Sequence, residues 1–148
     1  MFQRNLVKNW HEKKGASKNL AQKSVIVTDT KSGKAMTTPK PHERHVRVLL
    51  SPLLNQNIEN FAVGFTEVPP FTNGTRHQHS ESEIWMVISG TAIARVGTEE
   101  YQIASGSVVY TPAGTSHQFV NESSESVCIF FVYVPSGAER SIISGEFL

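Results

Sequence analysis

Short apolar runs separated by glycine and proline fill most of the chain after residue 24. Runs of β-branched, aromatic or alternating residues predict strands, because side chains two apart in a strand share a face. Such runs cover residues 46–50, 61–65, 83–89, 91–96, 100–103, 107–111, 117–120 and 127–134. Another run at 25–27, followed by turn residues at 30–34, predicts a hairpin at the start. No long helical pattern alternates with these strands, so we predict an all-β sandwich or barrel.

The two ends of the chain depart from this pattern. Residues 1–24 are polar and basic, with six Lys or Arg residues against one acid. We expect an irregular or partly helical N-terminal arm there, either a solvated terminus or a docking arm that uses Trp10. Residues 25–137 are expected to form one β-barrel domain, and residues 138–148 a tail that is either a short helix or irregular.

Length and composition narrow the class of protein. The chain has 148 residues, 39% of them hydrophobic, and a net charge of +1. That balance gives no reason to expect nucleic acid or a membrane as a partner. No apolar run approaches the ~20 residues of a spanning helix, and the first residues lack a secretory signal. Cys128 is the single cysteine, so no intrachain disulfide forms, and we expect a cytoplasmic protein.

Nine residues carry the candidate chemistry, in two blocks of fixed spacing. They are His77, His79, Glu83 and Gly90, then Gly106, Pro112, Gly114, His117 and Asn121. His77 and His79 are two apart and are expected to point the same way, Glu83 opens the next strand, and His117 arrives from a distant segment. Three imidazoles and one carboxylate are donors for a divalent transition metal. The glycines, proline and asparagine suit the turns between strands.

These two blocks resemble the paired motifs of the cupin superfamily, and the resemblance covers residues 77–121. It implies an all-β double-stranded β-helix, a jelly-roll barrel, and a homodimer. The family's metal ligands carry over onto His77, His79, Glu83 and His117. One position differs, because Phe71 stands where the first motif usually has a glycine, six residues before the first histidine.

The donor set predicts one divalent metal per chain. Four protein ligands with open positions favour Fe, Mn or Ni, while Zn, Co and Cu also accept such donors. No thiolate pair exists for a structural zinc site.

A metal with open positions inside a barrel predicts a metalloenzyme acting on a small organic molecule. Small cupins that resemble this chain include dioxygenases, isomerases, lyases and decarboxylases. One alternative is a non-catalytic module that binds a sugar-like or other small ligand, or acts as a sensor, and another is a metal-free structural barrel. The candidate catalytic residues are Glu83, as ligand and base, and Tyr110, as a proton donor. Arg47 is a candidate for pairing either with an anionic substrate or with surface charges.

Overall fold

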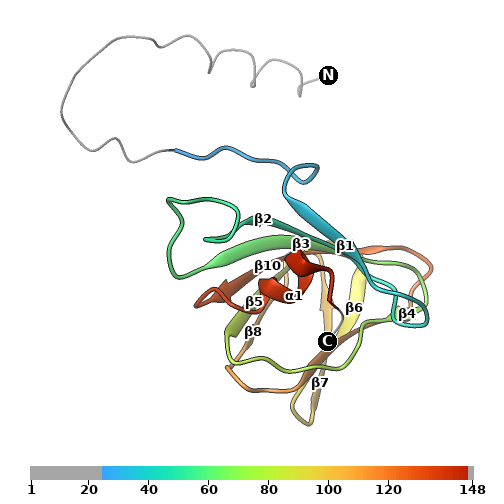
Figure 1. Ribbon diagram of the computed structural model, residues 1–148. Coiled ribbons are helices and arrows are strands. Elements are labelled where there is room, and N and C mark those ends of the chain that lie inside the picture. The colour runs from blue at the N-terminus through green and yellow to red at the C-terminus, as the bar shows by residue number, and fades with distance from the viewer. Residues whose placement is uncertain (1–24, 147–148) are drawn as a thin grey trace, which may run out of the picture.

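The computed structural model describes residues 25–146, which form ten strands and one short helix (Figure 1). The elements are β1 (Lys34–Thr37), β2 (His45–Leu50), β3 (Ala62–Val68), β4 (Thr72–Asn73), β5 (Ser82–Ser89), β6 (Thr91–Val96), β7 (Glu99–Ala104), β8 (Val108–Thr111), β9 (His117–Asn121), β10 (Val127–Val134) and α1 (Glu139–Ser144). None of the helical segments in this part of the chain is long and apolar enough to cross a membrane.

The strands form two antiparallel sheets. The larger has the order β1-β2-β3-β10-β5-β8, and the smaller has the order β4-β9-β6-β7. The last strand, β10, lies between β3 and β5, so strands far apart in the sequence become neighbours. This order is that of a jelly-roll barrel, and it confirms the predicted all-β class.

The first predicted hairpin is wrong. Residues 25–29 form no strand, and Val25 and Val27 are exposed. The turn that follows is closed by the Asp29 carboxylate, which accepts hydrogen bonds from the backbone N–H groups of Lys31 and Ser32. The chain then enters β1, which pairs with β2 instead of a preceding strand. The arm predicted over 1–24, with Trp10, lies outside the described residues.

Alternation along the central strands directs one face of each into the barrel. On β5 the buried residues are Glu83, Trp85 and Val87, while the residues between them are exposed. On β10 the buried face includes Phe131 and Tyr133, and Tyr133 lies directly opposite Glu83 in the register. An acid and a phenol therefore share the interior with apolar side chains.

Phe71, which precedes β4, has a φ of 52°. This left-handed conformation costs a non-glycine residue roughly 1–2 kcal/mol, and only glycine adopts it freely. The glycine usual at this position of the motif therefore has a conformational reason. Phe71 keeps the turn, since its N–H donates to the Ser123 carbonyl, but it does so under strain.

The C-terminal tail is helical and is anchored by a buried acid. The Ser51 hydroxyl donates to Glu139 Oε1 at 2.8 Å, and the Gly137 N–H donates to the other carboxylate oxygen. Ile142 of α1 is buried and lines the cavity that His77, His79 and Glu83 also line. The helix therefore covers one side of that cavity.

Candidate metal centre

Strand pairing brings His77 and His117 together. The His77 N–H donates to the His117 carbonyl at 3.1 Å, and the His117 N–H donates to the His77 carbonyl at 2.8 Å. Residues directly opposite each other in an antiparallel pair place their side chains on the same face. His79, two positions after His77, is fixed in turn because its carbonyl accepts from the Gly114 N–H at 2.8 Å.

Each of the three imidazoles uses its Nδ1 for a backbone carbonyl. The acceptors are Thr75 for His77 at 2.9 Å, Glu81 for His79 at 2.9 Å, and Thr115 for His117 at 2.7 Å. A carbonyl only accepts, so each Nδ1 carries the proton. The neutral ring then keeps its lone pair on Nε2, which is the arrangement typical of metal-bound histidine.

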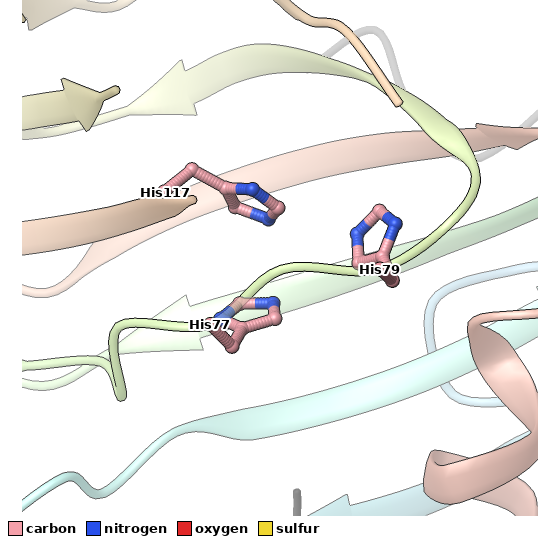
Figure 2. A group of neighbouring side chains, drawn as sticks. All are labelled: His77, His79 and His117. Carbon is pink, nitrogen blue, oxygen red and sulfur yellow. The ribbon is translucent and has the colours of Figure 1, made fainter. Parts of the chain in front are cut away.

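The three rings gather around one point in the barrel (Figure 2). Each of His77, His79 and His117 offers one ring nitrogen, and these nitrogens lie within 4.8 Å of one another. Glu83 Oε2 lies 3.1 Å from His117 Nε2 and 3.3 Å from His79 Nε2. Three histidines are therefore positioned to bind one metal ion.

The polar atoms at this point suit a bound cation. His117 Nε2 is buried and has no hydrogen-bond partner within residues 25–146, although a carboxylate oxygen lies beside it. A lone pair facing a carboxylate is unfavourable unless a proton or a metal lies between them. Neighbouring ligands ~2.1 Å from one metal, at right angles, are ~3.0 Å apart, close to the spacing of Glu83 from the two rings. The three histidines therefore fit one bound metal ion, with Glu83 beside two of them.

Burial and charge set the protonation of the site. Although burial raises the pKa of Glu83, its contacts with His117 and His79 lower that pKa to about 2. Burial, with the neighbouring His117 and Arg44, lowers the pKa of His77 to about 4. The pKa of His79 is raised, because contacts with Glu83 and Glu81 outweigh the effect of burial. At neutral pH the site therefore offers an ionised carboxylate and a neutral His77, both ready to coordinate.

A cavity of about 300 Å³ opens next to these ligands. His77, His79 and Glu83 line it, together with the apolar side chains of Val46, Phe119, Ile129 and Phe131. Tyr133 also lines it, with its ring 5.1 Å from that of His79. Burial, with the Glu83 charge, holds the pKa of Tyr133 well above its ordinary value. This phenol remains a neutral hydrogen-bond donor facing the cavity.

Tyr110, the predicted proton donor, does not reach the site. It is 61% exposed on the outer face of β8, opposite Ile84, and its oxygen lies 3.3 Å from Ser82 Oγ. Alternation explains the error, because Thr111 is the buried residue at this end of β8. Position in the strand before Pro112 suggested proximity to the metal, but it did not indicate the face.

Two cavity residues were missed or undervalued in the sequence. Tyr133 lies in an apolar run that gives no sign of a role at the site, and only the β5–β10 register reveals it beside Glu83. Arg44 also lines the cavity, whereas Arg47 faces outward and donates to the Ser32 carbonyl. The available signal was spacing, because position 44 shares a face with the apolar Val46 and Val48.

Sequence comparison places these residues in a known family. Residues 64–139 match a family model described as the cupin domain. An uncharacterised protein of Streptomyces coelicolor is 38% identical over 76 residues, covering 51% of this chain and 71% of that protein.

Solved structures share the fold at low identity. A predicted oxalate decarboxylase from Thermotoga maritima has a TM-score of 0.65 at 20% identity, over 75% of this chain and 100% of the other. The polyketide cyclase RemF from Streptomyces resistomycificus has a TM-score of 0.64 at 18% identity, over 75% and 80%. A cupin 2 conserved barrel domain protein from Salinispora arenicola has a TM-score of 0.56 at 20% identity, over 83% and 92%.

Proposed function

The chain belongs to the cupin family, and on this premise we propose that it is a metalloenzyme acting on a small organic molecule held in the barrel. In this proposal His77, His79 and His117 bind one divalent transition metal. Glu83 is the fourth ligand, because its carboxylate lies beside two of the three ring nitrogens. Iron, manganese or nickel is the favoured occupant.

One observation carries the proposal, namely that one ring nitrogen from each of three histidines lies within 4.8 Å of the others, beside a cavity that His77 and His79 line. The backbone carbonyls that hold each Nδ1 orient the rings before any metal arrives. A purely structural barrel gains nothing from a buried nitrogen without a partner. A metal-free scaffold is therefore the weakest of the three functions considered.

When bound, the metal supplies Lewis acidity to a substrate oxygen or to water. Glu83 balances part of its charge as an ionised carboxylate. Tyr133 offers a neutral phenol to an oxygen atom of the substrate, and the apolar walls limit the entry of water. The reaction class is open among oxygenation, isomerisation, lyase chemistry and decarboxylation.

A non-catalytic module that binds a small ligand is the second candidate. The observation in its favour is the pKa of Glu83, about 2, because a carboxylate so acidic is a weak general base at neutral pH. In that case Glu83 acts as a ligand only, and the cavity holds a molecule without transforming it.

Metal analysis tests the shared part of both candidates. Protein purified without chelators and reconstituted with Fe(II), Mn(II) or Ni(II) is expected to hold about one metal per chain. The double variant His77→Ala/His117→Ala is expected to hold none. His45→Ala is the matched control, because His45 is an exposed residue at the start of β2, beside Glu43. Stoichiometric metal in the double variant would overturn the ligand assignment.

Turnover separates the enzyme from the binding module. Metal-loaded protein is incubated with catechols, diketones, thiols and hydroxy acids while oxygen uptake and product masses are recorded. The enzyme proposal expects a product that disappears in the double variant. Tight binding of a panel member, detected by calorimetry without any product, would favour the binding module.

We also propose a homodimer formed through the outer face of the larger sheet. This face carries large apolar side chains in neighbouring register on β5, β8 and β10, and a contiguous apolar patch of this kind marks an interface. Its exposed members are Ile84, Met86, Ile88, Val108, Tyr110 and Val134. A two-fold dimer covers the same patch on both copies. Light scattering should give twice the chain mass, and Met86→Glu should reduce it to one chain.

The proposed location is the cytoplasm. Its support is the single cysteine, Cys128, which is half-buried and free.

A further inference from the structure

A positively charged side chain lies in the wall of the metal-site cavity. Arg44 directly precedes β2, and its backbone is held by Thr38. The Arg44 N–H donates to Thr38 Oγ1 at 2.7 Å, and the Thr38 N–H donates to the Arg44 carbonyl at 3.0 Å. Because side chains alternate, Arg44 shares the inward face of Val46 and Val48. Its guanidinium lines the same cavity as His77.

The guanidinium has no protein partner in the described part of the chain. Its Nε is buried and makes no hydrogen bond within residues 25–146. Among the same residues, none of the ion pairs within 4.0 Å involves Arg44. Burial lowers the pKa of this guanidinium, although the charges of Tyr133 and Glu83 act in the opposite direction. A partly buried charge without a hydrogen-bond or ion-pair partner is costly, and such a charge is available to a ligand that enters the cavity.

The charges around the cavity leave a positive excess at its inner end. A divalent metal held by neutral imidazoles and the Glu83 carboxylate carries one net positive charge, and Arg44 adds a second. Lys40 and Glu146 are the other charged side chains that line the cavity, and their opposite charges offset each other. Both are exposed, so water screens them more than it screens Arg44.

Space next to Arg44 is kept by a glycine. A Cβ added to Gly74 would lie 3.1 Å from Arg44 Cδ, closer than ordinary contact. Gly74 itself makes two hydrogen bonds with β9. Its N–H donates to the Phe119 carbonyl, and its carbonyl accepts from the Gln118 side-chain amide. The segment before His77 therefore positions both a metal ligand and the stem of the cation.

We propose that the cavity takes a small organic acid and that Arg44 binds its carboxylate. The inference rests on the proposed metal site, because Arg44 lines the same cavity as three of the proposed ligands, His77, His79 and Glu83. The planar guanidinium presents paired N–H groups that match the two oxygens of a carboxylate. A volume of about 300 Å³ is at the small end of ligand pockets and suits a molecule of a few carbon atoms. Apolar walls strengthen such a pair by excluding water.

Matched acids and amides test the assignment by calorimetry. Malonate, succinate, malonamide, succinamide and inorganic phosphate are titrated into Co(II)-loaded protein. Arg44→Gln is expected to weaken binding of the better dicarboxylate ten- to a hundredfold, the range for a charge-assisted hydrogen-bonded pair. Arg44→Lys keeps the positive charge but lacks the paired N–H groups of the guanidinium, so a smaller loss of affinity is expected than in Arg44→Gln. Arg47→Gln, the matched control on the outer face of β2, should leave binding within twofold of the original.

Several results would overturn the proposal. Arg44→Gln could bind the dicarboxylate as tightly as the original protein, or Arg47→Gln could lose as much affinity as Arg44→Gln. The amides could bind as tightly as the acids, or phosphate could bind more tightly than either dicarboxylate. Failure of every carboxylate to bind loaded protein at millimolar concentration would also overturn it.

Thermal stability distinguishes a binding role from a structural one. Arg44→Met removes a partly buried charge that has no ion-pair partner among residues 25–146, so the melting temperature without ligand should stay level or rise. The better dicarboxylate should then raise the melting temperature of the original protein but not of Arg44→Met. A marked loss of stability in Arg44→Met would show that Arg44 is structural.

Failure of the metal site is recognisable separately. If the original protein takes up no Co(II), the proposed function fails. Titration of succinate and malonate into the metal-free protein and its Arg44→Gln variant then still decides whether Arg44 binds carboxylate. Equal binding in those two proteins overturns the inference on its own.

Discussion

Lowering the pH from 8 to 5 is expected to weaken metal binding, and the pKa values of the histidines at the site determine by how much. Metal and protons compete for the same ring nitrogens, so affinity is greatest at high pH and falls as a ring takes up a proton. The pKa of His79 is raised above its ordinary value of 6.5. A group at 6.5 is about thirtyfold more often protonated than free at pH 5, so His79 alone weakens binding at least about thirtyfold.

His77 contributes little over the same range. Its pKa of about 4 leaves it only about one-tenth protonated at pH 5, whereas at its ordinary value it would add another factor of about thirty. Its effect is expected below pH 4.5. The metal-free fold is also affected, because the unfolded chain takes up this proton below pH 6.5 and the folded one does not. Stability therefore falls as pH drops from 6.5 toward 4.

The assay is competition for Ni(II) against a chromophoric chelator whose own proton binding is known at each pH. His45→Gln serves as control and should show the same pH dependence, since His45 lies outside the cavity. Affinity that stays constant between pH 8 and 5 would refute a histidine-based site. Proton NMR of the metal-free protein tests His77 itself, and a midpoint near 6.5 would refute the account of its burial.

Three further predictions concern single side chains. Phe71→Gly should raise the free energy of unfolding by about 0.5–1 kcal/mol in urea titrations, because relief of the positive φ outweighs the added entropy of the unfolded chain. The Phe71 side chain is 73% exposed, so little packing is lost. A free energy of unfolding below that of the original protein would show that the ring stabilises the fold by packing. Asn121→Ala should lower the same quantity by about 2–3 kcal/mol, because its amide donates to the carbonyls of Val68, Pro69 and Glu125; a change below the error of the fit would contradict this. Tyr110→Phe should leave turnover or ligand affinity within twofold of the original protein. Tyr133→Phe should reduce the same quantity about tenfold or more, the scale of one lost hydrogen bond. A larger loss in Tyr110→Phe than in Tyr133→Phe would show that Tyr110 acts at the site.

The asparagine shows how a turn residue read from the sequence acquires a larger role in the fold. Position 121 was expected only to suit the end of a strand. In the structure its amide reaches the end of β3, and its Oδ1 accepts from the N–H and hydroxyl of Ser123. Local preference for turns is visible in a sequence, but the identity of the carbonyls that gather around one amide is not.

The errors share a cause. Alternation shows that neighbours lie on opposite faces, but it does not show which face is inside. Tyr110, a candidate proton donor by its sequence position, faces outward, and Arg44, not Arg47, faces the cavity. The run at 25–27 has strand composition, but within residues 25–146 it pairs with no strand. Strand propensity alone does not make a strand, because its backbone groups need a partner.

The sequence by itself determined the all-β class, most strand positions and the histidines that converge, because periodicity and fixed spacing are local properties. Glycines at positions 90, 106 and 114 were likewise predictable as turn formers, and all three have positive φ. Only the tertiary structure decided that Tyr133 lies opposite Glu83, that Tyr110 faces outward, and that Arg44 lines the same cavity as His77, His79 and Glu83. The physical reason is that β10 pairs between β3 and β5, and such long-range register brings together residues whose separation in the chain carries no sign of it.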